Sequence, residues 1–333
     1  MLEKSITELH ELLKEGKITS EELVEESLKK SHEIKNKYNA FVTICDDAKE
    51  TKITDSLVSG IPFGVKDNYS TKDVLSTGSS NTLKNYVPFY TATVVQKLFD
   101  AGAIMTNKTA LDEFGMGGTG TTPHTGPVLN PWDPTRMCAG SSAGSACAVA
   151  SGVYPFALGS DTGDSIRKPA AYCGIVGYKP TYGMLSRYGL FPFASSLDHC
   201  GLLTRSVLDA AIVCDIMKGI DENDMTSWDS SKIHLKEALT GNIKGKKLFY
   251  IKEISDIKNY PNADETLKEH LKNFHQTLEL LKEEGATIEE VSMDQRLLNA
   301  IASVYVVISC AEATSNMSNL TGIIFGPRSE KQN

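Results

Sequence analysis

Up to about residue 220, short apolar runs alternate with stretches of helical periodicity, and this alternation restricts the fold of the chain. The apolar runs predict β-strands at residues 41–45, 61–65, 103–106, 154–158 and 175–178. Helical patterns lie at residues 93–101, 145–151 and 207–217. Strands that alternate with helices favour a sheet covered on both faces. We therefore predict an α/β protein with a mixed, mostly parallel central sheet between two layers of helices.

The chain is predicted to form one domain, residues 1–333, in three consecutive parts. Residues 1–50 are predicted to be helical, and residues 51–220 contain the alternating core. The composition then becomes charged and lysine-rich, so residues 221–333 are predicted to form a peripheral α/β part.

Local patterns predict several elements at the two ends of the chain. Thr19 and Glu22 have the spacing of a capping box, which marks a helix start. The last part of the chain is predicted to contain two strands and two helices, at residues 247–251, 287–291, 263–284 and 295–320. The last helix is mostly apolar, and we expect it to be buried.

Composition and charge exclude several classes of protein. The 34 basic and 42 acidic residues give a net charge of −8, so non-specific binding to nucleic acid or to an anionic membrane is disfavoured. The longest apolar stretch, residues 301–311, is shorter than the ~18 residues that a membrane span requires. Seven cysteines lack the C-x-x-C spacing of zinc or redox sites, so we expect buried, reduced thiols in a cytoplasmic protein.

Two short glycine motifs suggest alternative functions. Residues 115–120 match the dinucleotide pattern G-x-G-x-x-G, but no predicted strand leads directly into them. Residues 140–144 match the nucleophile elbow G-x-S-x-G around Ser142, and Asp161 and His199 follow in the order of a hydrolase triad. No strand is predicted immediately before residue 140, so the hydrolase remains a minor alternative. His124 and His199 lack neighbours at metal-ligand spacing, and we predict no metal site.

Three separate segments together carry a more specific pattern. They are GVKDN at residues 64–68, GSSAGS at 140–145 and GSDTGDSIRKPA at 159–170. This set resembles the amidase signature family, whose core segment reads G-S-D-T-G-G-S-I-R-x-P-A. The resemblance extends from the N-terminal helices to about Arg328. Within the family it is strongest to the glutaminase subunits of aminoacyl-tRNA amidotransferases, through residues 111–118, 180–183, 193–198 and 311–319.

The resemblance implies a Lys–Ser–Ser triad, in which Ser165 is the nucleophile, Ser141 the relay and Lys66 the base. A free lysine has a pKa near 10.4, so a base that works near neutral pH must have its pKa lowered by about 3 units through burial. The apolar residues 61–65 before Lys66 are suitable surroundings. The family holds the relay serine in a cis peptide, and small neighbours such as Gly140 would permit this.

The resemblance also implies roles for residues around the triad, with no metal among them. These are Thr162, Gly163 and Asp164 as backbone donors of an oxyanion hole, Met116 and Gly117 in a substrate-binding loop, and Asp161 and Arg167 as a supporting ion pair.

The implied reaction is the hydrolysis of glutamine through an ester on Ser165. The ammonia would pass to the B subunit of a heterotrimer, which would use ATP and Mg²⁺ to convert Glu-tRNA(Gln) to Gln-tRNA(Gln). A small C subunit would hold the two larger subunits together. This chain would need no cofactor and would meet tRNA only through its amidating partner. Two alternatives are a stand-alone amidase that acts on a small amide and a catalytically inactive scaffold subunit.

The residue before the nucleophile departs from the family pattern. Asp164 stands where the family has glycine, and a carboxylate ~4 Å from an oxyanion at an effective dielectric constant of ~20 would cost about 4 kcal/mol. Lys168 lies four residues later, so an i,i+4 ion pair is favoured if a helix begins here. We hypothesise that Lys168 draws the Asp164 carboxylate away from the oxyanion site.

The second departure is length, because the family's amidotransferase subunits continue well beyond Arg328. The resemblance places a basic and an acidic substrate-binding residue in that continuation. A truncated or frame-shifted reading frame is the favoured interpretation, and a split subunit or a shortened protein with another role are alternatives. An incomplete sheet would expose an edge and apolar surface, which predicts poor solubility.

Overall fold

The structure is a computed structural model, and it describes residues 1–328 of the chain. The chain divides into two compact units, of which the first comprises Met1–Ala238 and the chain from Ser309 onward and the second Leu239–Ile308. The second unit lies within the part that the sequence predicts to be peripheral. The assignment of all 333 residues to one family domain stays a prediction.

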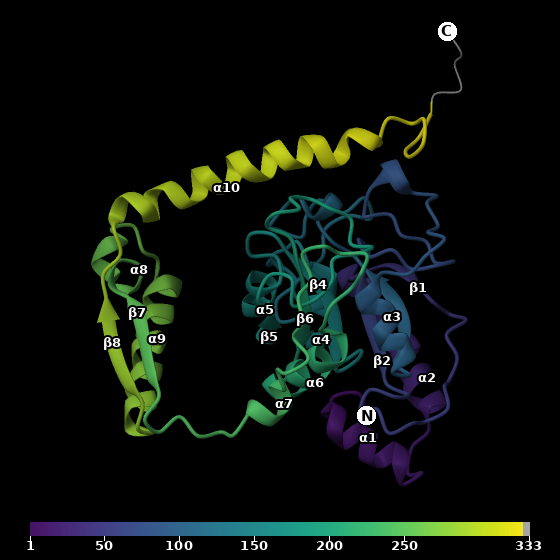
Figure 1. Ribbon diagram of the computed structural model, residues 1–333, viewed down its shortest axis with the longest axis horizontal. Coiled ribbons are helices and arrows are strands. Elements are labelled where there is room, and N and C mark those ends of the chain that lie inside the picture. Colours follow the sequence, from purple (N-terminus) through teal and green to yellow (C-terminus); the bar gives the residue numbers. More distant parts are fainter. Residues whose placement is uncertain (329–333) are drawn as a thin grey trace. The chain divides into compact units, whose positions relative to one another are not determined.

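A six-stranded mixed sheet forms the centre of the first unit (Figure 1). In spatial order the strands are β1 (Phe41–Ile44), β3 (Ile104–Thr109), β2 (Pro62–Lys66), β4 (Phe156–Asp161), β6 (His199–Thr204) and β5 (Val176–Tyr178). The predicted α/β class with a mixed sheet is confirmed. Parallel pairing, however, is limited to β3–β2 and β2–β4, and the other three pairings are antiparallel.

The strand β6 is the element that the sequence analysis missed. It pairs antiparallel with both β4 and β5, so it separates two strands that were expected to belong to a parallel series. Its six residues, HCGLLT, include a histidine and a glycine and show no clear alternation. A short buried strand of this kind has little periodicity to recognise. The insertion of β6 accounts for two of the three antiparallel pairings, and the third joins β1 to β3.

Helices cover both faces of the sheet and separate its apolar side chains into two cores. Phe156 and Leu158 of β4 belong to one core, together with residues of α3 and α6, whereas Ala157 belongs to the other core, with residues of α4 and α5. Alternate residues of a strand point to opposite faces, so β4 supplies both cores. The helices of this unit are α1 (Ile6–Lys14), α2 (Ser20–Tyr38), α3 (Thr93–Asp100), α4 (Ala143–Ala150), α5 (Arg167–Cys173), α6 (Val207–Met217) and α7 (Leu235–Ala238).

The start of α2 shows how local sequence sets these boundaries. The Thr19 hydroxyl accepts a hydrogen bond from the Glu22 N–H, and the Glu22 carboxylate accepts one from the Thr19 N–H. The predicted capping box is therefore confirmed. Short 3₁₀ turns also occur, at η1 (Asn81–Leu83), η2 (Glu113–Gly115), η3 (Ile257–Asn259) and η4 (Met317–Asn319).

The second unit is a small α/β element built around two parallel strands. β7 (Lys247–Ile251) pairs in register with β8 (Thr287–Val291), and both match the predicted strands. The long helix α9 (Glu265–Glu283) connects them, and the short helix α8 (Lys252–Ser255) follows β7 (Figure 1). A parallel pair needs a crossover of this kind, which explains why a long helix lies between the two strands.

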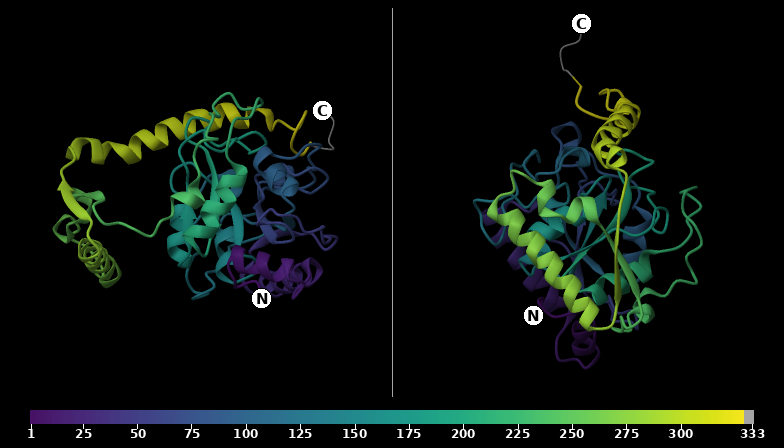
Figure 2. Two further views of the ribbon diagram at one scale, coloured as in Figure 1. Left: turned by 60° about the horizontal axis from the view of Figure 1, so that its bottom comes forward. Right: turned by 90° about the vertical axis from the view of Figure 1, so that its left-hand side faces the viewer.

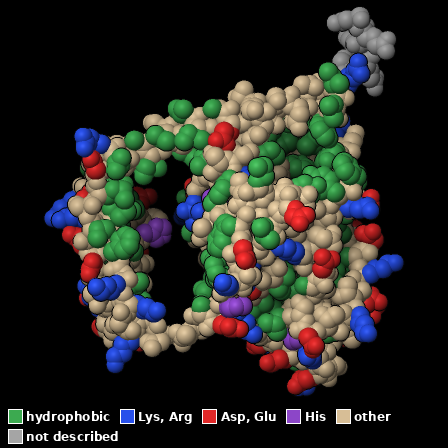
Figure 3. Space-filling model, in the orientation of Figure 1, with side chains coloured by type: hydrophobic (Ala, Val, Ile, Leu, Met, Phe, Trp, Pro, Cys, Tyr) green, Lys and Arg blue, Asp and Glu red, His purple; other side chains and the backbone are tan. Residues whose placement is uncertain are grey.

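The last helix, α10 (Gln295–Asn316), differs from its prediction. It is one continuous helix in both views of Figure 2. Among its residues only Ser309 is buried, and apolar side chains along it are visible in Figure 3, with Val307 69% exposed. The prediction of a buried helix is therefore wrong for residues 1–328. Its apolar composition does not create burial, because no other described segment encloses it.

Gln295–Asn319 is also the one segment of residues 1–328 that is long and apolar enough to cross a membrane. Core helices of proteins without a membrane share this length and composition. The expectation of no membrane contact stays a prediction.

The cysteines follow their prediction with one exception. Six of the seven are buried free thiols, and Cys310 on α10 is exposed. Cys310 is exposed because it lies on α10, which is itself exposed.

Close packing of α4 against the sheet yields a stability prediction. A Cβ at Gly144 would lie 2.2 Å from the Ala40 carbonyl oxygen and 2.5 Å from the Ala110 nitrogen. In an open helix a Gly→Ala change stabilises by ~1 kcal/mol. Here we expect Gly144→Ala to lower the free energy of unfolding by about 1–3 kcal/mol, because backbone must shift to admit the methyl group. Urea denaturation of the full chain measures this, and an unchanged or raised midpoint would contradict it.

Candidate active site

Lys66 lies at the end of β2, in the middle of the sheet, and its side chain is fully buried. Its Nζ lies 2.7 Å from Ser141 Oγ, 2.9 Å from Ser160 Oγ and 3.2 Å from the Ser160 carbonyl oxygen. A neutral amine can donate both N–H groups to Ser160 and accept the Ser141 hydroxyl proton on its lone pair. The geometry therefore suits a base for Ser141.

Burial lowers the pKa of Lys66 to about 7, even though the negative charges of Asp112, Asp161 and Asp198 act in the opposite direction. A cation taken out of water loses hydration, which favours its neutral form. Within residues 1–328 Lys66 forms no ion pair with a carboxylate, so nothing restores the charge at close range. A large fraction of Lys66 is therefore neutral near pH 7.

A second buried lysine on the adjacent strand shows the opposite arrangement. Lys108 Nζ lies 3.6 Å from Asp67 Oδ1 and donates hydrogen bonds to the Tyr69 carbonyl oxygen and the Ser76 hydroxyl. Burial lowers the pKa of Lys108, but the Asp67 charge opposes this at ion-pair distance. Both lysines contact a hydroxyl, and they differ in that Lys108 also has a carboxylate at ion-pair distance. Lys108 therefore fastens the chain after β2.

Ser141 is presented on a tight segment between β3 and α4. The Gly140–Ser141 peptide bond is cis, and Ser141 is 1% exposed. A Cβ at Gly140 would lie 2.1 Å from Asp112 Oδ2, so this close approach requires glycine. The Asp112 N–H donates to the Ser141 carbonyl oxygen, which fixes the segment against the chain that follows β3.

Ser165 follows a loop that begins where β4 ends. The Asp161 carboxylate accepts hydrogen bonds from the Ile166 N–H and from the backbone and side chain of Arg167, at the start of α5. These hydrogen bonds join the two ends of the loop formed by residues 162–165. The predicted Asp161–Arg167 ion pair is present, at 3.0 Å.

The loop contains backbone donors that remain free. Within residues 1–328, the N–H groups of Thr162, Gly163, Asp164 and Ser165 donate to no other group. Several adjacent free N–H groups form a ready site for a developing oxyanion. Their assignment as an oxyanion hole stays a prediction.

The two serines of the predicted triad lie on neighbouring loops, but their side chains are not bonded in the described chain. The Ser142 N–H donates to the Ser165 carbonyl oxygen at 3.1 Å, which brings the two loops together. No hydrogen bond joins Ser165 Oγ to Ser141 Oγ within residues 1–328. Catalytic hydrogen bonds are often loose in the absence of substrate, so this does not exclude the triad.

The competing nucleophile elbow is wrong. The Ser142 hydroxyl is fully buried, where it donates to the Ser160 carbonyl oxygen and accepts from the Ser160 N–H. His199 instead lies beside Lys179 and the Leu197 carbonyl oxygen. Ser142 therefore joins two loops and has no histidine to activate it.

The glycine-rich loop at residues 115–120 lacks the strand–loop–helix arrangement of a dinucleotide-binding motif, which the sequence analysis had treated as a minor alternative. It leads into no helix, and residues 119–122, at its end and directly after it, surround the buried Asp112 carboxylate. This carboxylate accepts hydrogen bonds from backbone N–H groups that a phosphate would need. These donors are Thr119, Gly120, Thr121 and Thr122. Met116 in this loop is 39% exposed. Gly115 borders the site, because a Cβ there would lie 3.8 Å from Ser141 Oγ. Substrate contact by Met116 and Gly117 stays a prediction.

The sequence analysis did not identify Ser160, Asn68 or Asp112 as site residues. Asn68 Nδ2 donates to Ser160 Oγ, the same hydroxyl that binds Lys66. Ser160 and Asn68 lie inside the motifs at 159–170 and 64–68, so their segments were recognised but not their roles. Only the chain fold brings them within 3 Å of each other.

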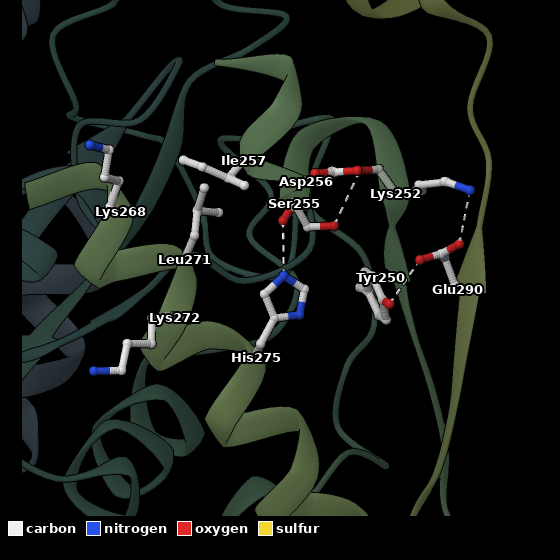
Figure 4. Close-up of a pocket in the computed structure, with 10 residues that line it drawn as sticks. All are labelled: Tyr250, Lys252, Ser255, Asp256, Ile257, Lys268, Leu271, Lys272, His275 and Glu290. Atoms are coloured by element: carbon white, nitrogen blue, oxygen red, sulfur yellow. Dashed lines mark hydrogen bonds and ion pairs between the residues drawn. The ribbon is translucent and has the colours of Figure 1, made fainter. Parts of the chain in front are cut away.

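A cavity of about 420 Å³ belongs to the second unit and is lined by none of the predicted site residues (Figure 4). Two of the lysines that line it form ion pairs, Lys252 with Glu290 and Lys268 with Glu265, so their positive charges are neutralised. His275 Nε2 lies 3.0 Å from the Ser255 carbonyl oxygen. Within residues 1–328 no cluster of side chains could hold a metal ion.

The hypothesis for Asp164 has structural support. Lys168 Nζ lies 2.8 Å from Asp164 Oδ2, and the Lys168 N–H donates to the Asp164 carbonyl oxygen. The Lys168 ammonium also lies next to the glycine-rich loop, because a Cβ added at Gly118 would lie 2.5 Å from Lys168 Nζ. The carboxylate before the nucleophile is therefore held by a cation on α5.

Comparison with known proteins gives consistent matches over nearly the whole chain. The family model for Amidase matches residues 22–333. The A subunit of the glutamyl-tRNA(Gln) amidotransferase of Enterococcus faecalis is 43% identical over 339 residues, which cover 99% of this chain and 68% of that protein.

Solved structures agree with the sequence matches. The A subunit of the glutamyl-tRNA(Gln) amidotransferase of Thermotoga maritima is 38% identical with a TM-score of 0.85, over 96% of this chain and 68% of that one. The peptide amidase of Stenotrophomonas maltophilia is 25% identical with a TM-score of 0.81, over 95% of this chain and 68% of that one.

The pKa of Lys66 predicts the pH dependence of nucleophile reactivity. Only neutral Lys66 can accept a proton, so labelling of Ser165 by a fluorophosphonate is expected to accelerate as pH rises, with a midpoint near 7. Lys66→Ala and Lys66→Arg should abolish labelling, since arginine stays protonated. Peptide mass spectrometry locates the adduct. Equal labelling of the Lys66→Ala variant, or an adduct on Ser142, would contradict the assignment.

The Asp164–Lys168 ion pair yields a second labelling prediction. Lys168→Gln frees the Asp164 carboxylate, and we expect the labelling rate of Ser165 to fall, by up to about a thousandfold if the charge reaches the oxyanion. The double variant Asp164→Gly with Lys168→Gln removes that charge and should recover the rate. A single Lys168→Gln variant with an unchanged rate would refute the hypothesis.

Proposed function

The chain belongs to the amidase family, and from this premise we propose that it is the glutaminase subunit of an aminoacyl-tRNA amidotransferase. The observation that carries the proposal is the buried Lys66, hydrogen-bonded to Ser141 beside a loop of free backbone donors at residues 162–165. Splitting an unactivated carboxamide requires a base, a nucleophile and oxyanion donors. The names of the amidotransferase relatives support glutamine as the amide.

In the proposed reaction Ser165 Oγ attacks the side-chain amide carbon of glutamine. Ser141 takes the proton of Ser165 and passes its own proton to neutral Lys66. The tetrahedral oxygen receives hydrogen bonds from the N–H groups of Thr162, Gly163 and Asp164. Protonation of the nitrogen through the same relay releases ammonia and leaves a glutamyl ester on Ser165. Water then attacks the ester by the reverse path, and glutamate is released.

The ammonia is proposed to pass to an amidating partner, the B subunit, where ATP and Mg²⁺ activate Glu-tRNA(Gln), and a small C subunit completes the heterotrimer. The chain's net charge of −8 is consistent with tRNA contact through the amidating partner, because an acidic surface repels phosphates. A cytoplasmic location follows from this role. No cofactor is proposed for this chain itself.

A stand-alone amidase is the second candidate, supported by the likeness to a peptide amidase over 95% of this chain. Both functions use the same triad, so the acceptor of the nitrogen separates them. An inactive scaffold would bind the B and C subunits without hydrolysing an amide.

The proposed function predicts a specific loss in a reconstituted complex. With the B and C subunits of a relative, the chain should form Gln-tRNA(Gln) from glutamine, ATP and Glu-tRNA(Gln). Ser165→Ala should abolish the glutamine-dependent reaction and retain the reaction with ammonium chloride, since the amidating partner uses free ammonia. Ser151→Ala, a serine at the end of α4, serves as the matched control with unchanged activity.

Two outcomes would contradict this proposal. Hydrolysis of small amides by the chain alone, with no tRNA product in the complex, would favour the stand-alone amidase. Assembly with the B and C subunits and no hydrolysis of glutamine would favour the scaffold.

A further inference from the structure

Asp198 is a buried carboxylate that directly precedes β6 and touches the loop before the proposed nucleophile. It is 3% exposed, and its Oδ1 accepts a hydrogen bond from the Thr162 hydroxyl at 2.5 Å. Its Oδ2 accepts the Phe193 N–H at 2.9 Å and the Ala194 N–H at 3.1 Å. Charge-assisted hydrogen bonds are short and strong, so this carboxylate ties Thr162 to a second segment of the chain.

Within residues 1–328, the hydrogen bond to Asp198 anchors Thr162, because no backbone hydrogen bond does so. Its N–H donates to no group within residues 1–328, and it lies just beyond the last residue of β4. Asp161 on one side is held by Arg167. The bond from the Thr162 side chain to Asp198 therefore holds the first of the free donors from the opposite side.

The segment that carries Asp198 is itself fastened at several points. The Ser195 carbonyl oxygen accepts from Tyr182 Oη at 2.7 Å and Arg187 Nη1 at 2.5 Å. The Ser196 hydroxyl and N–H donate to the Glu312 carboxylate at the C-terminal half of α10. Because this segment is fixed by several hydrogen bonds, Asp198 can hold Thr162 in a defined position.

Asp198 also contributes charge to the site. Together with Asp112 and Asp161 it favours the protonated form of Lys66, against burial. The Asp67–Lys108 ion pair at the end of β2 carries no net charge if both are ionised. Burial raises the pKa of Asp198 itself, and the Arg187 charge and the bonds from Thr162 and Ala194 oppose this.

We propose that Asp198 is a positioning residue of this active site, which holds the Thr162 N–H in place for the oxyanion and adds one negative charge to the field at Lys66. The proposal rests on the serine chemistry of the proposed function but not on the identity of the amide. It assigns a role to a residue that touches neither substrate nor the reacting atoms.

The test measures the rate of Ser165 labelling by a fluorophosphonate against pH, in the full chain. Asp198→Asn should slow labelling by about 10- to 100-fold, the range expected when one oxyanion donor is displaced. The pH midpoint should move to lower pH, because loss of a negative charge favours neutral Lys66. Thr162→Val should slow labelling to a similar degree and leave the midpoint unchanged, and Thr162→Ser, which keeps the hydroxyl, should restore the rate.

A double variant and a matched control complete the design. Asp198→Asn with Thr162→Val should be no slower than the slower single variant, because the two changes break one interaction. Asp209→Asn is the control, since Asp209 is equally buried and accepts the Ile6 N–H away from the site. It should leave both the rate and the midpoint unchanged.

The outcomes separate this inference from the proposed function. An unchanged rate in Asp198→Asn, or fully additive losses in the double variant, would overturn the positioning role. An unchanged midpoint in Asp198→Asn would overturn the contribution of its charge at Lys66. If the wild-type chain labels at Ser165 but hydrolyses no glutamine in the complex, the proposed function fails and the role of Asp198 is still decided. A folded wild-type chain that does not label at Ser165 overturns both.

Discussion

The burial of Lys66 without a carboxylate partner is the constraint on which the rest of the site depends. Water would keep this amine protonated, and an ion pair would do the same. The central strand β2 removes the water, and the hydroxyls of Ser141 and Ser160 satisfy the amine with neutral groups. A lysine in this position is costly for stability, and in the proposed mechanism its neutral form accepts a proton near pH 7.

The loops around Lys66 are held by carboxylates that do not themselves react. Asp112 binds the N–H groups of residues 119–122, Asp161 binds the start of α5, and Asp198 binds Thr162. Each is buried at the end of a strand or next to one, where free backbone N–H groups need an acceptor. These carboxylates thus shape the site and also set the electrostatic field around the lysine.

Much of the framework could be predicted from local sequence, because the strands β2, β4 and β7 and the helices α2, α6 and α9 have clear periodicity or caps. The strand β6 was missed because six mixed residues have no period to detect, and its antiparallel pairing changed the character of the sheet. The helix α10 was expected to be buried because it is apolar. A helix is buried only if another segment packs against its apolar side chains, and the local sequence does not show whether such a segment exists.

The sequence by itself determined which segments contain the residues proposed to carry the chemistry, since those at 64–68, 140–145 and 159–170 contain Lys66 and the serines around it. It did not determine the partners of the two buried lysines, or which of the five serines in these segments contact Lys66. Tertiary structure decided both: Lys108 lies 3.6 Å from Asp67, whereas Lys66 contacts the hydroxyls of Ser141 and Ser160. Ser142 is instead bound to the Ser160 backbone. The physical reason is that burial and charge act over a few ångströms in space, between residues that lie tens of positions apart along the chain.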